Sequence, residues 1–313
     1  MIELDAAALA ARLDRTSLVD ALDAAFRQPY VAPERMRCEV EGARPGARSG
    51  TLLVMPAWRV GGSLGVKVAT VFPDNAQLGL PAVAATYLLL EAATGQPRAL
   101  LDGAELTLRR TGAASALASR YLSRTGASRL LMVGTGKLAR HLIESHAAVR
   151  PLREVRIWGR RLERARAVAA SLDGAKLSIE AVADLESAVR WADIVSCATL
   201  SEQPLVRGAW LGPGQHLDLV GAFTPHMREC DDEALARAEI FVDTRAGAWA
   251  ESGELIGALA RGIIERDAVR ADLCELESGR FRRTRQEAVT LFKSVGCALE
   301  DLAAAELALE RAG

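Results

Sequence analysis

The sequence predicts an α/β protein in which a smaller, mainly antiparallel sheet precedes a doubly wound parallel sheet. Three observations predict this fold class. Strand-like runs follow one another across short turns before residue 129, whereas strand-like and helix-like patterns alternate after it. A glycine-rich turn joins the first strand of the alternating half to a helix. Short turns favour antiparallel pairing, and alternation is typical of a parallel sheet with helices on both faces.

The first half of the chain is predicted to contain helices at both ends and strands between them. Apolar residues recur at helical spacing over 5–27, and a connection rich in Pro, Gly and Arg occupies 28–50. Strands are expected at 51–55, 64–72, 84–90 and 98–101, and a helix at 107–123. In the second strand, Val66 and Val68 point to the face opposite Lys67, so Lys67 either faces a cleft or is an ordinary solvated lysine of the strand.

The second half repeats one unit, a strand followed by a helix. Strands are expected at 129–133, 154–158, 177–181, 193–197 and 215–219, and helices at 137–149, 161–172 and 184–190. The last segment contains a strand-like run at 288–292 and a helix at 294–311, and it resembles neither half. The length of 313 residues is typical of roughly two domains.

The composition excludes several classes of protein. The chain carries 39 basic and 40 acidic residues and is 50% hydrophobic, so it is neither disordered nor basic enough to neutralise nucleic-acid phosphates. Its longest uncharged run, 75–90, is interrupted by Gly79 and Pro81 and is too short for a membrane span. The start lacks a secretory signal, and the five cysteines are scattered. We therefore expect a cytoplasmic protein with no nucleic-acid or membrane partner.

The glycine-rich turn predicts a dinucleotide site. It reads G-x-G-x-x-A directly after an apolar strand: Gly134 permits the tight turn, Gly136 lets the backbone approach a pyrophosphate, and Ala139 lets helix and strand pack closely. The N-terminus of the helix supplies N–H donors to the phosphates. The alternative is a tight turn without a ligand. The residues expected to contact the cofactor here are Gly134, Thr135, Gly136, Lys137 and Leu138.

The end of the next strand favours NADP(H) over NAD(H). Enzymes that use NAD usually place an acid there to bind the ribose 2′-hydroxyl. Here Arg160 and Arg161 follow the strand, and Glu154 lies about 13 Å back along it, at ~3.3 Å per residue. Two guanidinium groups suit a 2′-phosphate. The alternative is that both are ordinary surface arginines of an Arg-rich chain.

A further set of phrases runs in consistent order along nearly the whole chain. These phrases are Pro33-Glu-Arg35, Leu53-Val-Met-Pro-Ala57, Gly65-Val-Lys67, Asn75, Gly79-Leu-Pro81, Asp102, Leu106-Thr-Leu-Arg-Arg110-Thr-Gly-Ala113, Gly134-Thr-Gly136, Ala192-Asp-Ile194, Pro213-Gly-Gln-His216, Val220-Gly221 and Thr290-Leu-Phe-Lys-Ser-Val-Gly296. Together they resemble the ornithine cyclodeaminase/μ-crystallin family. The resemblance implies a substrate-binding and dimerisation domain of residues 1–116 plus 288–313, with a Rossmann domain, 117–287, inserted into it. It also implies a homodimer whose N-terminal strands pair across the two-fold axis.

The resemblance implies a site for a small amino or imino acid. Its carboxylate clamp maps onto Arg35, Lys67 and Arg110, and fixed cations there would hold the substrate in hydride range. A buried lysine can also transfer a proton, so we assign catalysis to Lys67. The cofactor residues that the resemblance adds are Thr111, Thr199 and Val220. No metal is expected, because no Cys/His cluster has zinc spacing.

Two positions depart from ornithine cyclodeaminases of that family. Leu53 stands where they carry a Glu that holds the amino end of the substrate, and Phe223 stands where they carry an Asp that handles the reacting amine. An ammonium facing these apolar side chains would lose charge-assisted hydrogen bonds of roughly 1.5–3 kcal/mol each. We therefore expect an NAD(P)-dependent reductase of a ketimine or cyclic imino acid of the Δ1-pyrroline-2-carboxylate type, with Phe223 lining the substrate site. The alternatives are an ornithine cyclodeaminase and a cofactor-dependent binding protein without turnover.

Overall fold

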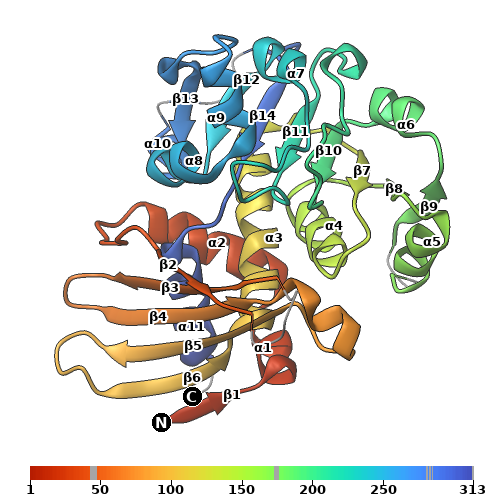
Figure 1. Ribbon diagram of the computed structural model, residues 1–313. Helices are drawn as coiled ribbons and strands as arrows, with labels where there is room; N and C mark the ends of the chain where they lie inside the picture. Colours follow the sequence, from red (N-terminus) through yellow and green to blue (C-terminus); the bar gives the residue numbers. More distant parts are fainter. Residues whose placement is uncertain (43–47, 173–175, 280, 282, 284, 312–313) are drawn as a thin grey trace. The chain divides into compact units, whose positions relative to one another are not determined.

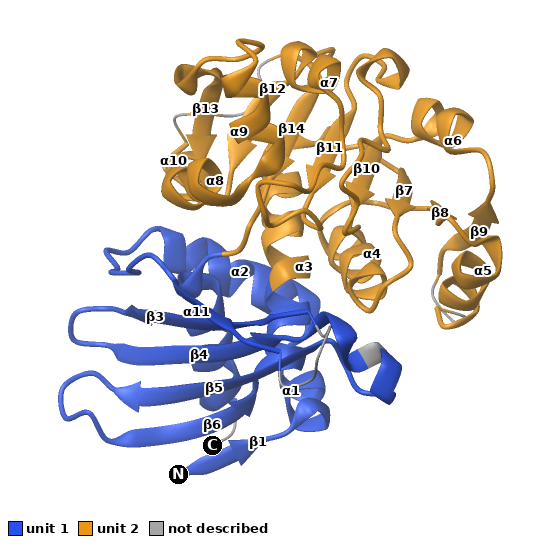
Figure 2. Ribbon diagram, in the orientation of Figure 1, with its two compact units in different colours: residues 1–110, 297–313 blue, residues 111–296 orange. Residues whose placement is uncertain are grey.

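The structure is a computed structural model that describes residues 1–42, 48–172, 176–279, 281, 283 and 285–311 (Figure 1). The chain divides into two compact units (Figure 2). Unit 1 consists of Met1–Arg110 and Cys297–Gly313, and unit 2 of Thr111–Gly296. The border between them falls inside one helix, α3 (Gly103–Leu122).

Unit 1 is built on a six-stranded sheet in the order β1-β6-β5-β4-β3-β2. Every neighbouring pair is antiparallel except β1 and β6, so the prediction of a mainly antiparallel sheet is confirmed. Two strands were not predicted. β1 is only three residues long, and β2 lies inside the expected connection with mostly exposed side chains. The strands are β1 (Ile2–Leu4), β2 (Met36–Val40), β3 (Gly50–Trp58), β4 (Ser63–Val71), β5 (Val83–Glu91) and β6 (Pro97–Asp102).

The helices of unit 1 correct one prediction. The segment expected to form one helix over 5–27 forms α1 (Ala6–Arg12) and α2 (Arg15–Phe26). The break lies at Asp14, whose carboxylate accepts a hydrogen bond from the Ser17 backbone N–H at 3.0 Å and so caps α2. The C-terminal helix α11 (Ala298–Glu310) packs against β3, β4, β5 and α2 (Figure 1). A short 3-10 helix (Pro73–Leu78) joins β4 to β5.

Unit 2 is built on an eight-stranded parallel sheet in the order β13-β12-β14-β11-β10-β7-β8-β9. The predicted doubly wound parallel sheet is confirmed: the order reverses between β7 and β10, and this is the switch point outside which such sheets bind ligands. The strands are β7 (Arg129–Val133), β8 (Glu154–Trp158), β9 (Ser178–Val182), β10 (Ile194–Cys197), β11 (His216–Leu219), β12 (Glu239–Val242), β13 (Val269–Asp272) and β14 (Thr290–Lys293).

The assignment of 288–313 to the first domain is wrong for its first part. β14 pairs with β11 on one side and β12 on the other, in the middle of the parallel sheet of unit 2. All four of its residues are buried, which suits a strand that is paired on both sides and covered on both faces. Only the segment from Cys297 onward belongs to unit 1. At the other border, unit 2 begins at Thr111 and not at residue 117.

Helices cover both faces of this parallel sheet. Leu131 and Val133 of β7 belong to one apolar core, whereas Leu130 and Met132 belong to the other. This alternation explains why the strand reads as a continuous apolar run. The covering helices are α4 (Leu138–Val149), α5 (Leu162–Ala170), α6 (Leu185–Trp191), α7 (Asp232–Arg237), α8 (Arg245–Glu251), α9 (Gly253–Ala260) and α10 (Leu273–Glu277).

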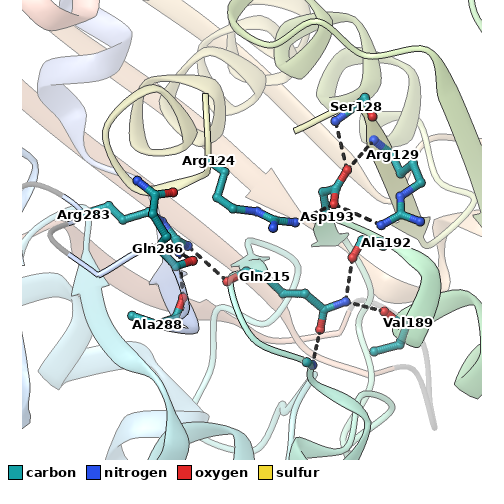
Figure 3. A network of polar contacts seen from close by, with 11 residues as sticks. Arg124, Ser128, Arg129, Val189, Ala192, Asp193, Gln215, Arg283, Gln286 and Ala288 are labelled. Atoms are coloured by element: carbon teal, nitrogen blue, oxygen red, sulfur yellow. Dashed lines mark hydrogen bonds and ion pairs between the residues drawn. The ribbon is translucent and has the colours of Figure 1, made fainter. Parts of the chain in front are cut away.

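A polar network fixes the amino ends of the strands of unit 2 (Figure 3). Asp193, just before β10, accepts hydrogen bonds from the Ser128 N–H at 3.0 Å and from the Arg124 guanidinium at 2.7 Å. The Gln215 amide, just before β11, donates to two backbone carbonyls at 2.6 Å, and Arg283 donates to the Ala288 carbonyl at 2.7 Å, ahead of β14. Ligands of such sheets bind at the opposite edge, outside the carboxyl ends of the strands.

In the described ranges of the chain, no helix combines the length and the apolar character that a membrane crossing requires.

Candidate active site

A buried carboxylate in unit 1 joins two of the predicted substrate residues. Asp301 of α11 accepts a hydrogen bond from Lys67 Nζ to Oδ2 at 2.7 Å and one from Arg110 Nε to Oδ1 at 2.9 Å. Lys67 lies in β4 with 3% of its surface exposed, Arg110 lies in α3 with 5%, and Asp301 is fully buried. β4 therefore points Lys67 to the buried face of the sheet, while Val68 on the opposite face is 43% exposed.

Two further side chains surround this pair. Glu300 accepts a hydrogen bond from Arg110 Nη1 at 2.6 Å, and its side chain is fully buried. Tyr87 of β5 lies opposite Lys67 in the sheet, and its buried hydroxyl has no hydrogen-bond partner among the described residues. A Cβ on Gly65 would lie 1.8 Å from that hydroxyl, so glycine is required there to make room for Tyr87.

The electrostatics of the cluster favour a lysine that can exchange a proton. Burial lowers the pKa of Lys67 to about 8, because an ammonium loses solvation there, although Asp301 opposes the shift. Burial also disfavours the charge on Arg110, but Asp301 and Glu300 outweigh it and raise the pKa of that guanidinium. For Asp301, burial is likewise outweighed by Arg110 and Lys67, which lower the pKa of its carboxyl.

The third predicted clamp residue, Arg35, lies in the segment before β2 and is half-buried. It is close enough to lower the pKa of Lys67 through its charge. The structure thus brings Arg35, Lys67 and Arg110 together in unit 1. Sequence reasoning missed Glu300 and Asp301. The available signal was two adjacent acids at the start of a helix rich in Ala and Leu, where burial demands ionic partners.

Leu53 lies on the face of the sheet that carries Lys67. Met55 of β3 pairs with Lys67 and Leu53 pairs with Ala69, and side chains directly opposite in an antiparallel pair share a face. Position 53 is therefore two residues along β3 from the neighbour of the lysine. An apolar side chain at this position offers no hydrogen bond to an ammonium.

In unit 2, the glycine turn after β7 fits a dinucleotide. Gly134 has φ +128°, a conformation that favours glycine, and a Cβ there would lie 2.5 Å from the Ala198 carbonyl oxygen. A Cβ on Gly136 would meet no atom within 4 Å among the described residues, which leaves room for a phosphate at the N-terminus of α4. Ala139 is fully buried between α4 and the sheet. Thr135 and Leu138 are half-buried here, whereas Lys137 is exposed at the start of the helix.

Arg160 and Arg161 directly follow β8, the strand that pairs with β7. Both side chains are exposed. Arg161 lies 3.8 Å from Glu163, a distance typical of a weak surface ion pair. The end of β8 therefore carries two solvated cations and no acidic side chain, as the sequence indicated.

The chain segments after β10 and β11 are held together by Glu229. Its Oε1 accepts hydrogen bonds from the N–H and hydroxyl of Thr199, at 2.7 and 2.9 Å, and its Oε2 accepts one from the Gly221 N–H at 2.8 Å. Val220, at the end of β11, is 9% exposed, and Phe223 follows two residues after Gly221 and is half-buried. The predicted residues Thr199 and Val220 therefore lie at the carboxyl edge, where the switch point places ligands.

A second buried ionic group supports the same edge. Lys293, the last residue of β14, donates to the Ala222 carbonyl at 2.6 Å and lies 3.2 Å from the Glu254 carboxylate. Glu254 also accepts a hydrogen bond from the Glu229 N–H at 2.9 Å. Sequence reasoning gave these residues no role, because the bonds join positions far apart in the chain.

The remaining predicted residue, Thr111, lies on α3 and is half-buried. At the next residue, Gly112, a Cβ would lie 2.9 Å from the His141 carbonyl of α4, so α3 passes close to the helix of the glycine turn. Within the described part of the chain, no group of three His, Cys, Asp or Glu side chains is arranged to hold a metal ion.

Comparison with known proteins identifies relatives along the whole chain. Residues 4–313 match the profile of the ornithine cyclodeaminase/mu-crystallin family. Protein SAR DEFICIENT 4 of Arabidopsis thaliana is 44% identical over 83% of this chain and 82% of its own. A Delta(1)-pyrroline-2-carboxylate reductase of Paracoccus denitrificans is 39% identical over 92% of this chain and 90% of the length of that protein. The ketimine reductase mu-crystallin of Rattus norvegicus is 34% identical over 79% of this chain and 76% of the length of that protein.

Two solved structures are similar over all of this chain. Delta(1)-pyrroline-2-carboxylate reductase of Thermococcus litoralis, in complex with NADH and L-proline, has a TM-score of 0.94 and 31% identity and is covered over 97% of its length. An archaeal alanine dehydrogenase dimer with bound NAD has a TM-score of 0.91 and 29% identity and is covered over 96%.

Proposed function

The chain belongs to the ornithine cyclodeaminase/mu-crystallin family, and we propose that it reduces the C=N bond of a ketimine or cyclic imino acid of the Δ1-pyrroline-2-carboxylate type with NADPH. The observation that carries the proposal is the cluster of Lys67, Arg110 and Asp301, which offers fixed cations and a lysine that can give up a proton. Relatives that are named as reductases of this substrate support the same reaction.

The substrate is anchored by its carboxylate. Arg110 and Arg35 supply permanent positive charge, and Lys67 supplies a compact ammonium that can also donate a proton. Because α11 and the sheet bury Lys67 and Arg110, the anchor is fixed before substrate arrives, which reduces the entropy cost of orienting the C=N bond.

The cofactor is a nicotinamide dinucleotide, whose pyrophosphate is held by the turn of Gly134 and Gly136 and by the N-terminus of α4. When bound, it supplies a hydride to the substrate carbon. As the electrons of the C=N double bond move onto nitrogen, Lys67 gives that nitrogen a proton, and the lysine is then reprotonated from solvent. Thr199 and Val220 shape the nicotinamide end of the site.

Ornithine cyclodeamination is the competing reaction. It requires polar groups for a second amine, and the face that carries Lys67 has Leu53 where an acid would be needed. Phe223 also offers only an apolar ring. These two residues favour an imino acid without a charged side chain over a diamino acid.

The proposal is tested by incubating the protein with NADPH and each of a set of cyclic and acyclic imino acids. Oxidation of NADPH is measured by the loss of the nicotinamide absorbance. Oxidation of NADPH by Δ1-pyrroline-2-carboxylate supports the reductase. Binding of NADPH without oxidation by any imino acid would instead support a cofactor-dependent binding protein. Release of ammonia and proline from ornithine would support the cyclodeaminase and contradict the argument from Leu53 and Phe223.

NADPH is proposed to bind more tightly than NADH because Arg160 and Arg161 donate charge-assisted hydrogen bonds to the 2′-phosphate. Replacing both with Ala is expected to raise the Kd of NADPH about 10-fold to 100-fold, since a charge-assisted hydrogen bond contributes roughly 1.5–3 kcal/mol and each 1.4 kcal/mol is tenfold. The Kd of NADH should change little. Fluorescence titration measures both, with Arg166→Ala, another exposed arginine of α5, as the control. Tighter binding of NADH than NADPH by the unaltered protein would contradict the proposal.

A homodimer through unit 1 is also proposed. The face of its sheet opposite α11 carries a row of apolar side chains, and Val68 at its centre is 43% exposed. A self-complementary apolar face suits a second copy of the chain around a two-fold axis. The related alanine dehydrogenase is a dimer. The other members of the row are Leu52, Val54, Leu64, Val66, Leu88 and Leu90.

Replacing Val68 with Asp should therefore convert the dimer to a monomer, because it places a charge in the apolar interface. Sedimentation equilibrium measures the mass. The matched control is Val60→Asp, at a turn residue that is 89% exposed and outside the row. A monomeric unaltered protein, or a Val68→Asp variant that stays dimeric, would contradict the proposal.

A further inference from the structure

One carboxylate holds both buried cations of the proposed substrate site. Each oxygen of Asp301 binds a different partner, Lys67 at 2.7 Å and Arg110 at 2.9 Å. The three groups come from α11, β4 and α3, so Asp301 connects these three elements at the site. We propose that Asp301 is a positioning residue that keeps the Lys67 ammonium aimed and protonated for transfer, and so sets the pH range of turnover. This inference rests on the proposed function.

The neighbouring acid provides a natural comparison. Glu300 precedes Asp301 on the same helix and is equally buried, yet its bond is to Arg110 at 2.6 Å and no bond from it to Lys67 is seen in the described residues. If burial of negative charge in α11 were the only requirement, the two acids would be equivalent. The geometry instead assigns the lysine to Asp301 and the support of the guanidinium to both.

A lysine at this position needs such a partner. It is buried, and burial alone drives an ammonium towards the neutral form. The charged or titratable groups that face it are Asp301 from α11, Arg110 from α3, Tyr87 from β5 and Arg35 from the segment before β2. The two arginines repel the ammonium, and burial raises the pKa of Tyr87 so far that it stays neutral. Only Asp301 in this set favours the protonated lysine.

The direction of the pH effect follows. Reduction of the C=N bond consumes one proton at nitrogen, so the rate falls as pH rises and Lys67 loses its proton. With the pKa of Lys67 at about 8, the falling limb of the pH profile lies near pH 8. Without the negative charge of Asp301, Lys67 loses its proton at lower pH. An opposite charge at hydrogen-bond distance shifts the pKa of such a group by about 1 to 3 units.

The first experiment measures Lys67 directly and needs no turnover. The chain contains only four lysines, so protein labelled with ¹³C at lysine Cε gives few signals, and the one missing in Lys67→Ala is that of Lys67. Its chemical shift is titrated against pH in the unaltered protein, in Asp301→Asn and in Glu300→Gln. We expect a midpoint about 1 to 3 pH units lower in Asp301→Asn and a much smaller change in Glu300→Gln. Equal midpoints in the two variants would overturn the proposal.

The second experiment follows kcat/KM for NADPH-dependent reduction across pH. The falling limb should move to lower pH in Asp301→Asn by the same amount as the Lys67 midpoint. A second variant, Arg110→Gln, should shift the titration midpoint of Lys67 in the opposite direction. This test does not require that Asp301→Asn folds. Removing the repulsion of Arg110 and leaving Asp301 to Lys67 alone should raise the midpoint of Lys67. A midpoint that is unchanged or lower in Arg110→Gln would overturn the proposal.

The two readouts separate failure of this inference from failure of the proposed function. If the unaltered protein reduces no imino acid, the proposed function fails, while the titration of Lys67 still reports whether Asp301 controls its protonation. If reduction occurs, but neither the falling limb of the pH profile nor the titration midpoint of Lys67 changes in Asp301→Asn, the proposed function stands and the positioning role is refuted.

Discussion

Replacing Lys67 with Ala is expected to lower kcat for imine reduction by about 10²–10⁴-fold, the range that a positioned proton donor contributes. The Kd of NADPH should stay within about twofold, because the glycine turn and the arginines after β8 that we propose as the cofactor site belong to unit 2, whereas Lys67 belongs to unit 1. Steady-state kinetics and fluorescence titration measure the two quantities.

Lys67→Arg separates charge from proton transfer. It keeps a cation beside Asp301, but a guanidinium stays protonated at all accessible pH values and cannot donate. KM for the imino acid should therefore rise less than in Lys67→Ala, while kcat stays low. A Lys67→Ala variant with more than about a third of the original kcat would refute the assignment of catalysis to this lysine.

Replacing Arg110 with Met is expected to cost about 3–5 kcal/mol of folding free energy, because it removes one partner of a buried ionic group. Asp301 would keep Lys67 as a partner, but Glu300 would lose the 2.6 Å bond to Arg110 and stay buried with its charge. Urea denaturation measures the loss, and KM for the substrate should rise as well.

Arg109→Met is the matched comparison for that variant. Arg109 is the preceding residue of α3; it pairs with Glu105, whose side chain is 17% exposed, and donates to the Leu13 carbonyl at 2.8 Å. Because Glu105 keeps access to water when Arg109 is removed, whereas Glu300 is fully buried, a smaller loss of folding free energy is expected than at Arg110. Combining Arg110→Met with Glu300→Gln should recover part of the stability, since the buried carboxylate that lost its bond to Arg110 is gone. Equal losses at positions 109 and 110, without recovery, would contradict the ionic account.

The parallel half of the fold was predictable because its central strands are buried on both faces and its strands alternate with helices. The errors have local causes. The helix at 5–27 breaks at Asp14, whose capping role competes with the apolar spacing around it. β14 was assigned to the wrong domain, because a four-residue strand carries no sign of which sheet it joins. No elements were predicted between residues 220 and 287, where the described residues form helices and the strands β12 and β13.

The site was predictable where a pattern was local. Alternation in β4 placed Lys67 inward, and the spacing of Gly134, Gly136 and Ala139 located the turn. Asp301 was missed because it reaches Lys67 from 234 positions away in the chain, through the return of α11. The ionic group of Glu229, Glu254 and Lys293 depends on tertiary packing in the same way.

The central claim is that hydride reaches the C=N carbon of an imino acid in this protein. It is tested most directly by incubating the protein with Δ1-pyrroline-2-carboxylate and NADPH deuterated at the nicotinamide C4 position, followed by mass spectrometry of the product. With both C4 hydrogens of the cofactor replaced by deuterium, we predict proline with one deuterium at Cα for each cofactor oxidised. NADPH that binds but is not oxidised, or proline without the label at Cα, would contradict the claim.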